Sequence, residues 1–180
     1  MNISKLSSSR SAQPFDWNAL VLAVVAFWFS SSALLDFFMM PMMYETGMMN
    51  EPTFATTGYS LFWLFNRLEL LCGAAALSGL LVIRQRGWDL NREFSVVASG
   101  LRSRWALLLS SLLLAIAFTF TYFLTPQMSA LGLHLSGTFS DPAPNAMGHM
   151  HLVYWSLEAI KLFACGGLIT LCYRDMSATR

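Results

Sequence analysis

Residues 151–173 read HLVYWSLEAIKLFACGGLITLCY, and this stretch decides the fold. It exceeds the roughly 20 residues that a helix needs to cross about 30 Å of hydrocarbon. At about 100° per residue, its polar and sulfur-bearing side chains fall on one stripe, with aliphatic side chains opposite. The stripe comprises His151, Tyr154, Glu158, Lys161, Cys165 and Cys172. The stretch therefore predicts a membrane-spanning helix whose polar stripe faces other helices.

Three more apolar stretches of similar length precede this one. The chain is 56% hydrophobic and 12% charged, whereas a soluble domain has about 25% charged residues. Backbone polar groups in lipid must be satisfied within each segment, so these stretches are expected to be helices. The predicted fold is all-α, a four-transmembrane-helix bundle over residues 17–173, with tails at 1–16 and 174–180. The spans lie at about 18–43, 58–83, 105–124 and 147–173, the third closed by Thr125-Pro126.

The Lys and Arg residues outside the spans lie on one side of the predicted bundle. They occur in the N-terminal tail, in the loop between spans two and three, and after span four, whereas the loops 44–57 and 125–146 contain none. Cytoplasmic loops of membrane proteins carry the excess of Lys and Arg. We therefore expect both termini and the middle loop in the cytoplasm, in a multi-pass protein of a bacterial inner membrane or a thylakoid membrane.

The middle loop contains apolar residues at helical spacing. Leu90, Phe94, Val97 and Leu101 recur there, with polar and charged residues between them. This pattern is typical of a short amphipathic helix lying on the membrane surface. A plain linker is the alternative that the spacing leaves open.

Five ionisable residues fall within the spans. They are Asp36, Arg67, Glu69, Glu158 and Lys161. Each costs about 2.5–3.5 kcal/mol near the bilayer centre on insertion scales, so we predict a buried polar network of these residues with Asn66 and Tyr154. Their depth favours pairing of Glu69 with Lys161, and of Asp36 or Glu158 with Arg67. Such a network either fixes helix register alone or forms a proton path or ligand site.

Small and sulfur-bearing residues indicate close packing between spans. Several small residues are predicted to let helices approach closely. These are Ala74, Ala75, Ser78 and Gly79 in span two, with Gly166 and Gly167 in span four. Cys72, Cys165 and Cys172 all lie in apolar stretches, and an odd number cannot form a complete disulfide set. We expect them to be buried free thiols that pack as small apolar side chains.

Histidines and methionines gather on the expected outer side. His134, His149 and His151 lie in the second outer loop or at the start of span four, and Met150 stands between the last two. Thioether sulfur suits Cu(I), and imidazole suits copper, zinc or iron. These residues therefore form a candidate metal site, with copper expected first. A bis-histidine haem is disfavoured, because the spans offer imidazoles from one helix alone.

Short motifs in and beside the spans resemble those of a known family. They are Asp36-Phe37-Phe38-Met39-Met40-Pro41, Asn66-Arg67, Thr125-Pro126-Gln127-Met128, and His151 with Tyr154, Glu158 and Lys161. Over residues 17–173 the chain is similar to a family of four-helix membrane proteins of unknown function (transmembrane-protein-205-like), distantly grouped with the bacterial copper-resistance D membrane proteins. The Glu158/Lys161 version most resembles the cyanobacterial members. The resemblance implies a four-helix bundle, and the distant relatives suggest copper or haem handling.

The sequence shows no catalytic constellation. It contains no Ser/His/Asp or Cys/His grouping, phosphate-binding loop or HExxH, and its few basic residues are too scattered for a nucleic-acid site. We therefore predict a non-enzymatic accessory or assembly protein, with the lipid bilayer and other membrane-protein subunits as partners. The alternatives are copper or other metal handling at the outer face, and a small transporter or proton conductor that uses Glu69, Glu158 and Lys161.

Overall fold

The computed structural model describes residues 16–47, 54–90, 97–135 and 143–178, and these residues contain helices and no strand. The first rod joins α1 (Trp17–Leu34), the π-helix η1 (Leu35–Met39) and α2 (Met40–Glu45). The second is α3 (Phe54–Leu90). The third joins α4 (Val97–Thr119), the π-helix η3 (Phe120–Leu124) and α5 (Thr125–Leu135), and the fourth is α6 (Ala143–Ala178).

Four helices of the described chain are long and apolar enough to cross a membrane, which confirms the predicted number of spans. They are Trp17–Glu45, Thr57–Gln85, Arg104–Ala130 and Gly148–Ser177. The first begins where Asp16 accepts hydrogen bonds from the backbone N–H groups of Asn18 and Ala19 at 3.0 and 3.3 Å. A carboxylate at this position satisfies N–H groups that have no partner inside the helix.

The third span does not end at Pro126, so this prediction is wrong. The helix continues through the proline as α5. Proline lacks an N–H, and its ring clashes with the carbonyl four residues back. A π-helix ends two residues before both Pro41 and Pro126, and the N–H of the residue preceding each proline donates to the carbonyl five residues back. The wider turn accommodates the proline without ending the helix.

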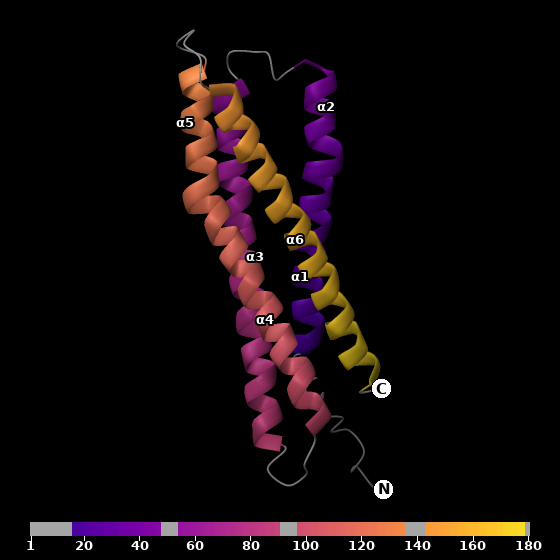
Figure 1. The fold of residues 1–180 in the computed structure, drawn as a ribbon. Coiled ribbons are helices and arrows are strands. Elements are labelled where there is room, and N and C mark those ends of the chain that lie inside the picture. Colours follow the sequence, from indigo (N-terminus) through magenta and orange to yellow (C-terminus); the bar gives the residue numbers. More distant parts are fainter. Residues whose placement is uncertain (1–15, 48–53, 91–96, 136–142, 179–180) are drawn as a thin grey trace, which may run out of the picture.

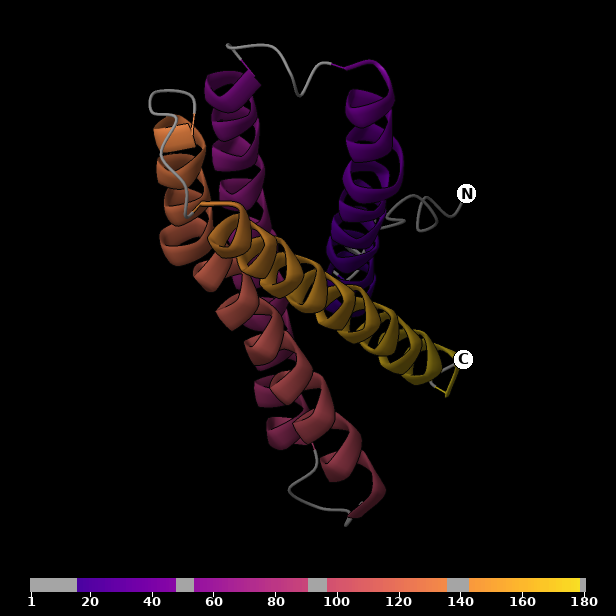
Figure 2. The same ribbon diagram turned by 45° about the horizontal axis from the view of Figure 1, so that its top comes forward.

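The four spans form a bundle in which each helix has two main neighbours. α1 packs against α3 and α6, and α4 packs against the same two helices. α3 and α6 therefore face each other across the bundle. α6 runs obliquely, from beside α5 at one end to beside α1 at the other (Figure 1 and Figure 2).

The two ends of the bundle differ in charge. Arg84, Arg104 and Arg174 lie where α3 and α6 finish and α4 begins, and we call this the basic end (Figure 1). Among the described residues, the opposite end contains Glu45 and no Lys or Arg, and we call it the acidic end. Which side of the membrane each end faces stays a prediction.

The predicted surface helix has no element of its own in the described chain. Leu90 is the last residue of α3, and Val97 and Leu101 belong to α4. Phe94 lies in residues 91–96, outside the described residues, as do the N-terminal tail up to residue 15 and the last two residues of the chain.

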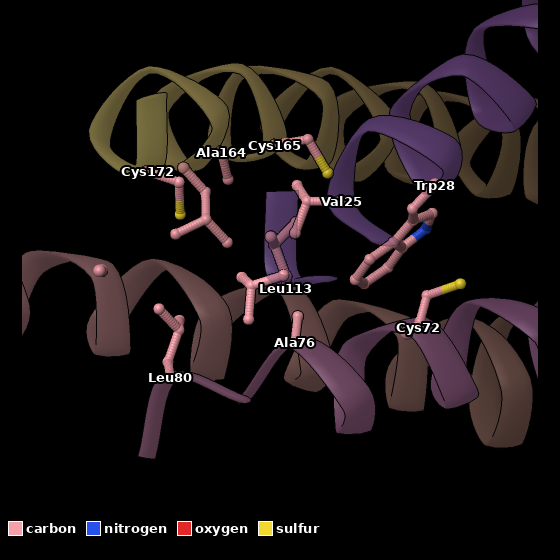
Figure 3. Close-up of a cluster of buried hydrophobic side chains, with 13 residues drawn as sticks. Val25, Trp28, Cys72, Ala76, Leu80, Leu113, Ala164, Cys165 and Cys172 are labelled. Atoms are coloured by element: carbon pink, nitrogen blue, oxygen red, sulfur yellow. The ribbon is translucent and has the colours of Figure 1, made fainter. Parts of the chain in front are cut away.

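Buried residues recur with the alternating three-four spacing of left-handed helix packing. They are Val21, Val25, Trp28 and Ser32 in α1, Ala106, Ser110, Leu113 and Ala117 in α4, and Glu158, Lys161, Cys165, Leu168 and Cys172 in α6. Figure 3 shows Val25, Leu113 and Ala76 pointing toward one another from three helices. The three cysteines are buried free thiols, as predicted. Each of these helices thus buries a narrow stripe and leaves its other side to lipid.

Close approach of α1 and α3 depends on a glycine. A Cβ added to Gly79 would lie 2.4 Å from Cγ2 of Val21. The neighbouring small residues Ala74, Ala75 and Ser78 are instead exposed, because the buried side of α3 is turned away from them. Of the predicted set in span two, Gly79 therefore makes the close contact.

Replacing Gly79 by Ala is expected to lower the free energy of unfolding by about 1–3 kcal/mol, the usual cost of overpacking. The added methyl group meets Val21 and forces α1 and α3 apart. Gly166→Ala is the matched control, because a Cβ there meets nothing within 4 Å. Unfolding in mixed mild and denaturing detergent measures both variants. Equal stability of the two would contradict a tight contact at Gly79.

Candidate functional site

Lys161 lies at the centre of a group of buried ionisable side chains. Its Nζ lies 2.5 Å from Oε1 of Glu69 on α3 and 2.7 Å from Oε1 of Glu158, one turn earlier on α6. These three side chains are at most 2% exposed, and Asp36 in η1 is 1% exposed. We call Asp36, Glu69, Glu158 and Lys161 the charge cluster.

One oxygen of Glu69 collects three donors. Besides Nζ of Lys161, Oε1 accepts hydrogen bonds from Nε1 of Trp28 at 3.1 Å and from the hydroxyl of Ser32 at 3.0 Å. Both additional donors come from α1, so this single oxygen links three helices. Three donors around one oxygen suit an ionised carboxylate, which only accepts hydrogen bonds.

Asp36 occupies the side of the cluster nearer the acidic end. Its Oδ1 accepts a hydrogen bond from the hydroxyl of Tyr154 at 3.0 Å, and Tyr154 lies about one turn before Glu158 on α6. Asp36 Oδ2, Glu69 Oε2 and Glu158 Oε2 are buried and make no hydrogen bond within the described chain. The cluster therefore holds more acceptor oxygens than the described donors satisfy.

Aromatic rings surround the cationic centre. Nζ of Lys161 lies 5.1 Å from the ring centroid of Phe120 and 6.0 Å from that of Phe65. The ring of Tyr154 lies 5.4 Å from that of Phe120 and 6.2 Å, edge-on, from that of Phe62. Ring faces attract a cation. An apolar surrounding also strengthens the hydrogen bonds within it.

The charge cluster lies deep within the spans. Glu69 and Glu158 lie ~15–18 Å from the acidic-end limits of their spans, at 1.5 Å per residue. On the side toward the basic end, an apolar core that includes Val21, Val25 and Leu168 follows the cluster. The polar groups therefore extend toward the acidic end and are closed off toward the basic end.

The structure brings together most of the residues predicted for the buried network, including the Glu69–Lys161 pair. Asn66 is buried, but its Nδ2 donates to Oγ1 of Thr125 at 2.6 Å. The Thr121 hydroxyl donates to the carbonyl of Asn66 at 3.4 Å. Asn66 therefore ties α3 to η3 and α5 and makes no side-chain hydrogen bond to the cluster within the described residues.

The predicted pairing of Arg67 with Asp36 or Glu158 is wrong. Arg67 is exposed on α3, and its guanidinium carbon lies 4.0 Å from the ring centroid of Trp63. Two positions along a helix correspond to about 200° of rotation, so Arg67 and Glu69 cannot face the same interior. Lys161 provides the cation of the cluster.

Sequence reasoning missed Trp28 and Ser32 as partners of Glu69. Their spacing contains the signal that would find them, because they continue the three-four pattern of Val21 and Val25 on α1. That pattern predicts a buried stripe, and a buried indole N–H or hydroxyl needs an acceptor.

The described residues do not support the candidate metal site. His149 and His151 are exposed on α6, and Met150 is half-buried. His134 belongs to α5, but its side chain lies outside the described part. Within that part, no group of three or more His, Cys, Asp or Glu residues is arranged to hold a metal ion. Copper and haem therefore gain no support from the described geometry.

No protein-family model, curated protein or solved structure matches this chain. The similarity to the four-helix family therefore stays a prediction. Function must be inferred from the charge cluster and from the surfaces of the helices that form it.

Lys161→Met is expected to lower the free energy of unfolding by about 3–5 kcal/mol, because it leaves Glu69 and Glu158 buried without their cation. The double variant Glu69→Gln/Lys161→Met removes charge from both partners and is expected to recover part of that loss. Detergent unfolding of the wild type, both single variants and the double variant forms a double-mutant cycle. Additive losses would contradict a direct Glu69–Lys161 interaction.

Proposed function

We propose that this membrane protein takes up and releases a proton at the charge cluster and acts as a small proton-transfer or proton-coupled transport protein. The observation that carries the proposal is the composition of the cluster, in which three buried carboxyl groups share one ammonium group. With every group ionised, two negative charges would lack compensation. Uncompensated charge in an apolar interior is costly, and binding a proton removes one such charge. Intramembrane carboxyl groups of this kind are typical of proton relays.

The buried acceptor oxygens of the cluster support a proton as the bound species. An ionised carboxylate only accepts hydrogen bonds, whereas a protonated carboxyl group also donates one. A bound proton would therefore provide a partner for a buried oxygen that has none among the described residues. A metal cation is less favoured, because the described part of the chain contains no suitable group of ligands.

The polar groups form an array beside α6. Tyr154, whose hydroxyl bonds to Asp36, lies about one turn before Glu158, and Glu158 contacts Lys161, which also contacts Glu69. From Tyr154 to Lys161 the array covers ~10 Å of helix at 1.5 Å per residue, about a third of the hydrocarbon thickness. We infer that the proton enters from the acidic end. Transfer to the basic end then requires a change in the packing of the apolar core.

Glu158→Gln is expected to reduce proton flux into proteoliposomes by about tenfold or more, because an amide cannot take up the transferred proton. Flux is measured with a pH-sensitive dye trapped inside the vesicles under an imposed membrane potential. Glu45→Gln is the matched control, because it removes an exposed carboxyl group at the acidic end and is expected to leave the flux unchanged. Wild-type flux no greater than that of empty vesicles, or full flux in Glu158→Gln, would contradict the proposal.

We also propose that the protein is an accessory subunit of a larger membrane complex, and Arg67 favours this second function. Arg67 is exposed within the α3 span, ~15 Å from Thr57 at 1.5 Å per residue. An arginine in hydrocarbon costs about 2.5–3.5 kcal/mol on insertion scales near the bilayer centre. Its described contact is the ring of Trp63. A neighbouring chain would supply the counter-charge that the described residues do not.

Extraction of native membranes in mild detergent is expected to release the protein with at least one other membrane protein. The complex would migrate on a native gel well above the position of this 20.1 kDa chain in its micelle. Extraction in a denaturing detergent is the control and should collapse the complex to the single chain. A monodisperse lone protein after mild extraction would contradict the subunit proposal.

A further inference from the structure

One strip of α3 carries a charge within the membrane span and is left exposed by the bundle. The strip consists of exposed residues at helical spacing. These are Trp63, Leu64, Arg67, Leu71, Ala74, Ala75 and Ser78. The other exposed charged side chains of the described helices lie near span ends, for example Glu45 and Arg104. We call these seven residues the outer strip of α3.

The guanidinium of Arg67 is positioned by Trp63 but lacks a described counter-ion. Its Cζ lies 4.0 Å from the centre of the Trp63 ring, and the ion pairs of the described cluster involve Lys161 instead. A guanidinium that stacks on a ring still presents N–H donors at its edge, in a fork that matches a carboxylate. The geometry therefore leaves a donor group directed outside this chain.

The rest of the strip is shaped for close contact with a helix. Leu64 and Leu71 are 64% and 67% exposed, respectively. Ala74, Ala75 and Ser78 follow them and are also exposed. Small residues let two helix backbones approach closely in a membrane. Within this bundle, Gly79 allows the close approach of α1 and lies on a different side of α3. The exposed small residues therefore take no part in the described helix contacts.

We propose that the outer strip of α3 binds a transmembrane helix of another membrane protein, and that this helix carries an Asp or Glu opposite Arg67. The proposal rests on the subunit function proposed above and adds the surface and the chemistry of the partner. Arg67 would form a bidentate ion pair with the partner carboxylate beside Trp63, where water is excluded. The alanines and Ser78 would receive the backbone of the same helix.

Charge complementarity selects this occupant over a second copy of the chain. Within the described spans, Asp36, Glu69 and Glu158 are buried in the charge cluster. The exposed acids of the described helices, such as Glu45, lie near span ends. Among the described residues, a second copy therefore has no exposed carboxylate at the same membrane depth as Arg67. A lipid phosphate would pair with the charge but would make no use of the small residues.

Photo-crosslinking of the full chain in its native membrane tests the proposal. The probe is benzoylphenylalanine placed at Leu71, one turn from Arg67, with the same probe at Phe163 on α6 as the control, since that side chain is 83% exposed. We expect a crosslink to another protein from the first position and none to that protein from the second. Arg67→Gln should lower the yield about tenfold, because it removes one partner of a desolvated charge pair, whereas Arg67→Lys should keep part of it.

Mass spectrometry of the crosslinked peptide identifies the segment that lies against the strip. The proposal requires an apolar segment with an Asp or Glu within about one turn of the crosslink. Reversing both charges, with Arg67→Glu and the partner acid changed to Arg, should restore the crosslink that Arg67→Glu alone abolishes.

Several results would overturn the proposal. They are a crosslink to a second copy, a partner segment without an acid, an unchanged yield in Arg67→Gln, and retention of a phospholipid that Arg67→Gln loses while no protein is crosslinked. The native gel separates this inference from the subunit function. A wild-type complex that persists without these crosslinks overturns the proposed surface alone, whereas the absence of any complex overturns both.

Discussion

The rest of the structure depends on one buried contact, the ammonium of Lys161 held between Glu69 and Glu158. An ion pair in a low-dielectric interior tolerates few other arrangements of its partners, because removal or displacement of one partner leaves the other charge buried and unpaired. The contact crosses the bundle from α6 to α3, and Trp28 and Ser32 extend it to α1 through the same Glu69 oxygen. A rotation or a one-turn slide of any of these helices would break it. The cluster therefore fixes the register of these helices, because their lipid-facing sides do little to determine it.

The two π-helices lie at the level of this contact. Asp36 belongs to η1 and Phe120, whose ring faces Lys161, belongs to η3. Each π-helix is followed by a proline, so the backbone hydrogen-bond ladder of both composite helices is altered beside the cluster. Asn66 bonds to Thr125 and holds the far side of η3 against α3. The helices are thus regular toward the basic end and contain π-helices beside the cluster, from which the polar groups extend toward the acidic end.

The sequence predicts the parts of this structure that follow from helical period and charge. It fails where the rotation of a helix about its axis decides which side chains are buried. Four spans and the Glu69–Lys161 pair follow from apolar length, depth and shared faces. The expectation that a charge in a span is buried predicts Arg67 inside the bundle, but its neighbour Glu69 already defines the interior side of α3. The spacing on α1 predicts that Trp28 is buried, but its acceptor Glu69 depends on how α1 packs against α3. The continuation past Pro126 depends on the π-helix η3, and the proline alone does not predict it, because a proline inside a helix commonly ends or kinks it.

The two proposed functions meet on α3. Glu69 points into the cluster and Arg67, two positions earlier, points to the outside, so one helix would carry the proposed proton site on one side and the proposed partner strip on the other. A partner that binds more tightly in one protonation state of the cluster must change the proton affinity of the cluster by the same factor, because binding linkage is reciprocal. The contact of Glu69 with Lys161 would provide the physical route for this coupling, since a movement of α3 against α6 would alter it. With both proposals in place, pairing of Arg67 by a partner and protonation of the cluster would be linked through α3.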